Sequence, residues 1–212
     1  MKKALLTAGL ALFGLSASAQ WNEGSIMATG NLGFSTGGTA EDDGTSSTDI
    51  FSNSAFNIGI TGGYFIQDNL AVGIGLGYAN TSVTVEPIET ETTTSMLTYG
   101  LFGRYYVPYN DKFSMYGQLS IGFGSGGQTI TDNINDATAE TDMSALNAGL
   151  GVGLTYFVND MFFLDASYGF LGYSSSTTTE DPGGNNELKT TTSNFGLDLD
   201  LSSIAFGVGV LF

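Results

Sequence analysis

The last ten residues, Ser203-Ile204-Ala205-Phe206-Gly207-Val208-Gly209-Val210-Leu211-Phe212, alternate large and small side chains. One face carries the large ones, and they are Ile204, Phe206, Val208, Val210 and Phe212. The other face is small except for Leu211. A period of two predicts a β-strand. A soluble protein turns the bulky face of a strand toward its core. Here the small face would leave little core to fill, so we expect the bulky face to meet lipid.

This strand resembles the carboxyl-terminal β-signal of bacterial outer-membrane barrels, which ends in Phe. The resemblance implies that Phe206, Val208, Val210 and Phe212 serve as an assembly signal. It also implies that the barrel-assembly machinery is a partner during biogenesis.

The amino terminus is typical of a secretory signal peptide. Met1-Lys2-Lys3 is a positive region, an apolar run covers residues 4–15, and Ala17-Ser18-Ala19 forms a cleavage site before Gln20. The alternative is a membrane anchor, but 12 residues are too few to span a bilayer as a helix. We therefore expect residues 1–19 to be cleaved and residues 20–212 to form one barrel domain.

The composition excludes several functional classes. Without the signal, three cations stand against 21 acidic residues, a net charge of −18. Nucleic acid is not an expected partner, because phosphate binding needs clustered Lys and Arg. The chain has no Cys and no His. After residue 19 there is no apolar run of the roughly 18 residues that a membrane helix needs.

Alternating segments divide the mature chain into eight expected strands, near residues 25–35, 55–65, 70–79, 96–106, 113–123, 146–156, 164–170 and 195–212. Outward positions in the seventh strand are Leu164, Ala166, Tyr168 and Phe170. In the last strand the outward phase shifts at Ser202-Ser203, which predicts a bulge there. Short turns near residues 67–69, 108–111 and 159–160 alternate with long polar loops near residues 36–53, 86–94, 125–142 and 174–192.

An aromatic pair precedes each short turn: Tyr64-Phe65, Tyr105-Tyr106 and Tyr156-Phe157. Such pairs suit an aromatic girdle at a membrane interface. A soluble sandwich could also alternate, but it would not need aromatic residues at one depth of every hairpin. We therefore predict an all-β fold, an eight-stranded antiparallel up-and-down transmembrane β-barrel with short periplasmic turns and long extracellular loops.

The mature chain resembles the small outer-membrane barrel family typified by the transmembrane domain of outer membrane protein A and by outer membrane protein X. The similar segments are Gly62-Gly63-Tyr64-Phe65, Asp68-Asn69-Leu70-Ala71-Val72-Gly73 and Gly103-Arg104-Tyr105-Tyr106. The resemblance implies location in the outer membrane of a Gram-negative bacterium, with outer-membrane lipid as a partner. We expect a monomer, because a closed barrel has no free strand edge.

The inward positions predict how the barrel is filled. Strands three, six and eight present mainly Gly and Ala, whereas the strands between them present bulky groups such as Phe102, Tyr116 and Phe163. An eight-stranded barrel is just wide enough for side chains to fill. We favour an interior filled by interdigitated side chains, and the alternative is an open pore.

Counting from the turns places Arg104 and Asp165 inside the barrel at a similar depth. A charge inside a membrane barrel needs a partner, so we predict an interior polar pair with a stabilising role. Asp198 and Asp200 face inward near the outer rim and are a possible cation site. The alternative is that both are solvated rim groups.

Most acidic residues fall in or beside the four long loops. Fourteen of the 21 do so, among Thr and Ser. One interpretation is a repulsive, solvated surface that discourages aggregation. The other is a surface that binds an extracellular ligand or a divalent cation, although no loop matches a calcium-loop motif.

Three functional classes remain to be compared. We expect no enzyme, because the chain has no His base and no Gly-x-Ser-x-Gly elbow, and we predict no catalytic residue, cofactor or metal. A small pore or channel for small or hydrophobic solutes is the alternative function. We favour a structural or surface-interaction protein that displays acidic, Thr-rich loops.

Overall fold

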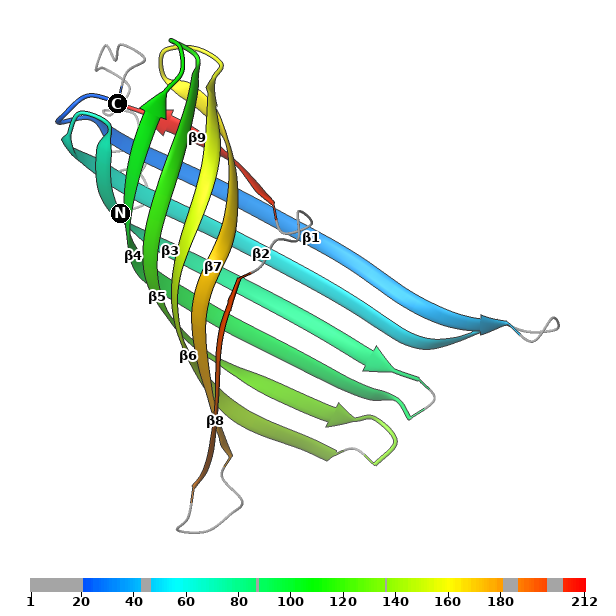
Figure 1. Ribbon diagram of the computed structural model, residues 1–212. Helices are drawn as coiled ribbons and strands as arrows, with labels where there is room; N and C mark the ends of the chain where they lie inside the picture. The colour runs from blue at the N-terminus through cyan, green and yellow to red at the C-terminus, as the bar shows by residue number, and fades with distance from the viewer. Residues whose placement is uncertain (1–20, 43–46, 87, 136, 181–186, 198–203) are drawn as a thin grey trace, which may run out of the picture.

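The computed structural model describes residues 21–42, 47–86, 88–135, 137–180, 187–197 and 204–212. It is an all-β ring of antiparallel strands (Figure 1). The strands are β1 (Ile26–Asp42), β2 (Ser47–Gln67), β3 (Leu70–Val85), β4 (Thr90–Pro108), β5 (Phe113–Asp132), β6 (Ala137–Phe157), β7 (Phe162–Glu180), β8 (Leu188–Leu197) and β9 (Ala205–Leu211). No helix in these ranges is long and apolar enough to cross a membrane.

The ring closes at the end where the short turns lie, which we call the turn end. Neighbouring strands pair in sequence from β1 to β7, and β9 joins β7 to β1. Both β8 and β9 pair with β7, β8 along residues 171–180 and β9 along residues 162–167. Together they take the eighth position of the predicted barrel.

Away from the turns, the strands continue as hairpins toward what we call the tip end. Figure 1 shows these hairpins diverging from the closed ring. Within the described residues, β1 beyond Gly30 pairs only with β2, and β8 pairs only with β7. The hydrogen-bonded ring is therefore a feature of the turn end.

The predicted long loops are largely strand, and this corrects the sequence analysis. Strands β1 to β7 have 16 to 21 residues, about twice the 9–11 needed to cross a bilayer. Thr favours extended backbone, and hydroxyls bond across the hairpin, as in Thr177 with Thr191 at 2.9 Å. The polar segments thus satisfy their backbone groups by pairing, and only short connections remain at the tips.

The outer face separates into two zones along the strands. Within about ten residues of the turns, outward positions carry exposed apolar side chains, such as Leu101 and Leu119. Farther out, the same strands become rich in Thr, Ser and acidic residues. An apolar band at the turn end is what a barrel needs to sit in a bilayer, with the polar hairpins projecting beyond it.

One predicted outward residue lies at a bulge. The β6–β7 ladder passes from the pair Gly151–Gly169 to the pair Leu150–Leu171, so Phe170 has no ladder partner. One extra residue reverses the phase of the strand, and beyond it the exposed large apolar side chain is Tyr173, at an odd-numbered position. The predicted outward phase of β7 therefore fails at Phe170. The bulge predicted at Ser202-Ser203 lies outside the described residues.

Candidate functional site

The barrel interior contains an ion pair near the turn end. Arg104 on β4 and Asp165 on β7 are 5% and 8% exposed, and Arg104 Nη1 lies 3.5 Å from Asp165 Oδ2. The two strands are not neighbours in the ring, so the pair reaches across the lumen. The structure thus brings together the two residues that the sequence analysis paired.

Neighbouring side chains satisfy the remaining groups of this pair. Arg104 donates from Nε to Gln118 Oε1 at 2.9 Å and from Nη1 to the Tyr106 hydroxyl at 3.1 Å. Tyr116 donates its hydroxyl to Asp165 Oδ1 at 2.9 Å, and the guanidinium carbon lies 4.0 Å from the Tyr116 ring centre. Buried charges in this arrangement stabilise the fold only as a connected set.

Between this network and the turns lies a cluster of rings that we call the aromatic plug: Trp21, Phe65, Tyr106, Phe157 and Phe163. Trp21 stacks on Tyr106 with ring centres 3.9 Å apart and contacts the three other rings within 5.5 Å. Its indole Nε1 donates to Ser114 Oγ at 2.9 Å. Trp21 is only 3% exposed, so the plug fills the lumen at the turn end.

Backbone hydrogen bonds hold the segment that carries Trp21 in place. The Asn69 N–H donates to the Trp21 carbonyl at 2.6 Å, and the Glu23 N–H donates to Asp68 Oδ1 at 2.9 Å. The Gly24 N–H donates to the Phe65 carbonyl at 2.9 Å. The plug residue is therefore fixed to the β2–β3 turn and does not depend on side-chain packing alone.

Alternation predicts Phe65, Tyr106 and Phe163 as inward bulky side chains, but it does not reveal that Trp21 and Phe157 complete a plug with them. In each aromatic pair before a turn the first ring is exposed on the outer face, as Tyr64, Tyr105 and Tyr156 are. The second ring is buried inside, as Phe65, Tyr106 and Phe157 are. The second ring of each pair therefore belongs to the aromatic plug and not to the predicted girdle. Two features of the sequence pointed to the plug. Adjacent residues of a strand face opposite sides, so one ring of each pair must face inward, and the single Trp comes just after the expected cleavage site.

Glycines opposite aromatic rings create the space for this filling. A Cβ on Gly153 would lie 2.1 Å from Tyr116 Cζ, and one on Gly209 would lie 2.2 Å from Phe163 Cζ. A Cβ on Gly73 would lie within 2.7 Å of the Phe102 ring. The predicted interdigitation of small and bulky strands is confirmed for these layers.

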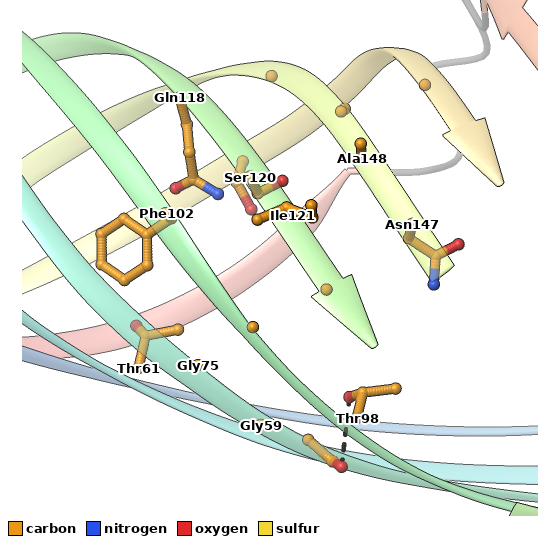
Figure 2. Close-up of a pocket in the computed structure, with 18 of the residues that line it drawn as sticks. Gly59, Thr61, Gly75, Thr98, Phe102, Gln118, Ser120, Ile121, Asn147 and Ala148 are labelled. Atoms are coloured by element: carbon orange, nitrogen blue, oxygen red, sulfur yellow. Dashed lines mark hydrogen bonds between the residues drawn. The ribbon is translucent and has the colours of Figure 1, made fainter. Parts of the chain in front are cut away.

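Beyond the filled layers the lumen is hollow, so the predicted filling by side chains extends over the turn end only. A cavity of about 1010 Å³, which we call the vestibule, is lined by residues of β1 to β8. Figure 2 shows Phe102 and Gln118 among its lining, with Thr61, Ser120 and Asn147 around the wall. The inward positions here are Gly or small polar residues, which are too small to fill an eight-stranded barrel.

The other predicted site residues have separate positions. Phe206 and Val208 are exposed on the outer face of β9, while Leu211 points inward and is fully buried. Phe212 and Ile26 exchange backbone hydrogen bonds of 2.8 and 2.9 Å, which join the carboxyl terminus to the start of β1. Asp198 and Asp200 lie outside the described residues. In the described part of the chain, no group of three acidic residues is placed to hold a metal ion.

A family model described as outer membrane protein beta-barrel domain matches residues 5–200. No curated protein matches the chain significantly.

Solved structures give the same fold. Outer membrane protein OprG from Pseudomonas aeruginosa is 16% identical, with 92% of this chain and 99% of that chain covered and a TM-score of 0.50. A major outer membrane protein from Thermus thermophilus is 15% identical, with 89% and 99% covered and a TM-score of 0.53. Ail, the attachment invasion locus protein of Yersinia pestis, solved with the heparin analogue sucrose octasulfate, is 16% identical, with 90% and 99% covered and a TM-score of 0.47. At these identities the likeness to the first two structures concerns the fold alone.

Proposed function

Because the chain belongs to the outer membrane protein β-barrel domain family, we propose that it is a non-conducting outer-membrane protein with a structural or surface-interaction role. The observation that carries this proposal is the aromatic plug. Trp21 and four further rings occupy the lumen at the turn end, directly beneath the Arg104–Asp165 network. Side chains packed in this way leave no wide path for solutes.

The projecting hairpins support the surface role. Strands twice as long as a bilayer crossing place polar β-structure outside the apolar band. In the described part of that region the cation Lys189 is paired with Glu187 at 3.0 Å, whereas acidic residues are numerous. An acidic surface of this kind repels anionic partners and favours cationic ones.

The remaining parts of the proposal concern biogenesis and chemistry. Residues 1–19 act as a cleaved signal peptide, and the carboxyl-terminal strand ending at Phe212 acts as the assembly signal. Proteins of this family are generally non-enzymatic. The absence of His from the sequence supports the proposal that this chain is also not an enzyme.

The alternative is a small pore or channel for small or hydrophobic solutes. The vestibule favours it, because a hollow of about 1010 Å³ provides the outer half of a conducting path. The two functions differ at the turn end, where a pore needs an opening and our proposal needs a seal.

Planar-bilayer conductance tests the seal. The protein is residues 20–212 refolded in detergent, with its unheated gel mobility confirming a folded barrel. We expect no discrete conductance steps. Reproducible steps from folded wild-type protein would overturn the proposal and favour the pore. The variant Trp21→Ala is measured alongside, because steps confined to it would assign the seal to this one ring.

A shortened hairpin tests the surface role. Residues 37–53 are replaced by Asn-Gly, which suits a two-residue turn between the paired residues Thr36 and Ser54. We expect a folded barrel whose host cells adhere less to a polylysine-coated surface. The matched control keeps the hairpin length and neutralises its acids with Glu41→Gln, Asp42→Asn, Asp43→Asn and Asp49→Asn. Unchanged adhesion in both variants would contradict a role for this hairpin.

A further inference from the structure

The vestibule is distinguished by the chemistry of its lining. Among the described residues around it, none is Asp, Glu, Lys or Arg. This contrasts with the chain as a whole, in which acidic residues outnumber cations by 16. A repulsive surface does not need neutral lining residues, so the described lining of the vestibule is a separate feature from the acidic hairpins.

Neutral hydrogen-bonding groups surround the space. Asn31, Asn57, Asn147 and Asn194 contribute amides from four different strands. Thr61, Thr98, Ser120 and Ser167 contribute hydroxyls. Thr98 donates to the Gly77 carbonyl at 3.3 Å, which places its hydroxyl within the wall (Figure 2). Amides and hydroxyls both donate and accept, so this wall suits a ligand that does the same.

The floor of the vestibule is aromatic and rigid. Phe102 and Tyr116 line it from below, and Gln118 lies beside them. Tyr116 is fixed by its hydrogen bond to Asp165, and Gln118 is fixed by the bond that it accepts from Arg104. A preformed floor of this kind costs little ordering when a ligand binds.

We propose that the vestibule is a binding site for a small neutral saccharide. Sugar hydroxyls match the amides and hydroxyls of the wall. A volume of about 1010 Å³ is at the upper end of the range of roughly 300–1,000 Å³ for ligand pockets, so there is room for a short oligomer. Charged solutes find no opposite charge among the described lining residues. The plug closes the site below, so the saccharide is held and not conducted.

The test is isothermal titration calorimetry with folded residues 20–212 in a zwitterionic detergent, because a detergent with a sugar headgroup would compete. The probes are three trimers of similar size: neutral triacetylchitotriose, the cationic glucosamine trimer and anionic trigalacturonate. We expect the neutral trimer to bind and, in salt that screens attraction to the acidic hairpins, the charged trimers to bind at least tenfold more weakly. No heat from the neutral trimer at millimolar concentration would overturn the proposal, as would equal binding of all three.

A matched pair of variants on β5 localises the binding. Gly122 lines the vestibule, and a Cβ added there would lie 3.6 Å from the Tyr99 carbonyl oxygen, an ordinary contact, so Gly122→Leu adds a bulky side chain at the vestibule wall. Gly117 lies on the opposite face with no atom within 4 Å, so Gly117→Leu adds the same side chain outside. We expect Gly122→Leu to reduce affinity at least tenfold and Gly117→Leu to leave it unchanged. Equal effects of the two would place the ligand elsewhere.

A milder variant keeps the proposal testable if Gly122→Leu does not fold. Asn147→Ala removes one amide from the wall and adds no bulk. Loss of one neutral hydrogen bond should weaken binding of the neutral trimer about threefold to tenfold. An unchanged affinity in both Asn147→Ala and Asn57→Ala would contradict recognition by the amide ring.

Discussion

Arg104 Nη1 lies 3.5 Å from Asp165 Oδ2 across the barrel lumen, and both side chains are buried. Removing one partner leaves a buried charge without compensation. We therefore expect Arg104→Leu to lower the free energy of unfolding by about 3–5 kcal/mol. The measurement is urea unfolding of the refolded barrel, followed by its gel mobility. An unchanged midpoint would contradict the pairing.

A double variant separates the ion pair from simple loss of volume. Arg104→Leu with Asp165→Leu leaves no charge, so we expect it to recover much of the stability lost in either single variant. Lys189→Leu is the control, because Lys189 forms an exposed pair with Glu187 and should change stability by less than about 1 kcal/mol. Additive single effects would mean that the two charges do not interact.

Gly153 lies against a ring that is buried and hydrogen-bonded, and this contact gives the second prediction. A Cβ there would be 2.1 Å from Tyr116 Cζ, and Tyr116 is held by its hydrogen bond to Asp165. We expect Gly153→Ala to destabilise the barrel by about 1–3 kcal/mol, as overpacking generally does. Gly117→Ala is the control, since no atom lies within 4 Å of its Cβ position. Equal midpoints for the two variants would contradict the tight Gly153–Tyr116 contact.

The chain has a single Trp, so its fluorescence reports directly on the plug. Trp21 is buried, and its indole N–H donates to Ser114. We expect blue-shifted emission that aqueous acrylamide quenches poorly. Ser114→Ala leaves that donor unsatisfied and should cost about 1–3 kcal/mol, measured by unfolding at the Trp emission. Ser125→Ala, at an exposed site on the same strand, is the control. Red-shifted, freely quenched emission would show that Trp21 lies outside the lumen.

Period-two alternation predicted much of the structure, because a strand in a barrel has only two faces. The inward phase of β4 and β7, counted from their turns, was enough to bring Arg104 and Asp165 to the same depth. The same counting placed Phe102 and Tyr116 inside and assigned glycines to the strands beside them. A short turn fixes the register between the two strands that it joins. Counting residues from the turn therefore places side chains at the correct depth near the turn end.

What the sequence did not reveal depends on contacts that alternation does not encode. Trp21 precedes the first strand, so no strand phase placed it inside the barrel, and its position depends on bonds to the β2–β3 turn. The bulge at Phe170 reverses a phase, and Gly169 beside it gave no specific signal because glycines are frequent throughout the strands. Thr-rich segments were read as loops because they are polar, although Thr favours strands when its backbone is paired.

The tip of the β5–β6 hairpin yields a prediction about pH. Asp132 lies there, beyond the apolar band, and its carboxylate accepts hydrogen bonds from the Asn135 side chain at 2.7 Å and from two backbone N–H groups. These bonds, the Asn135 side chain first, hold the pKa of Asp132 below its ordinary value of 3.8. Because the folded pKa is the lower one, this turn is stabilised above pH 3.8, and the stabilisation is lost as the pH falls through the folded pKa.

Carbon-13 NMR titration of the Asp132 carboxyl in folded protein checks this expectation. Asn135→Ala removes the strongest donor and should move the midpoint upward, but not fully to 3.8, because the backbone donors of Ile134 and Asn135 remain. Asn110→Ala, in a turn at the opposite end of the barrel, should leave the Asp132 midpoint unchanged. A wild-type midpoint at or above 3.8 would mean that the Asp132 turn is not formed in solution.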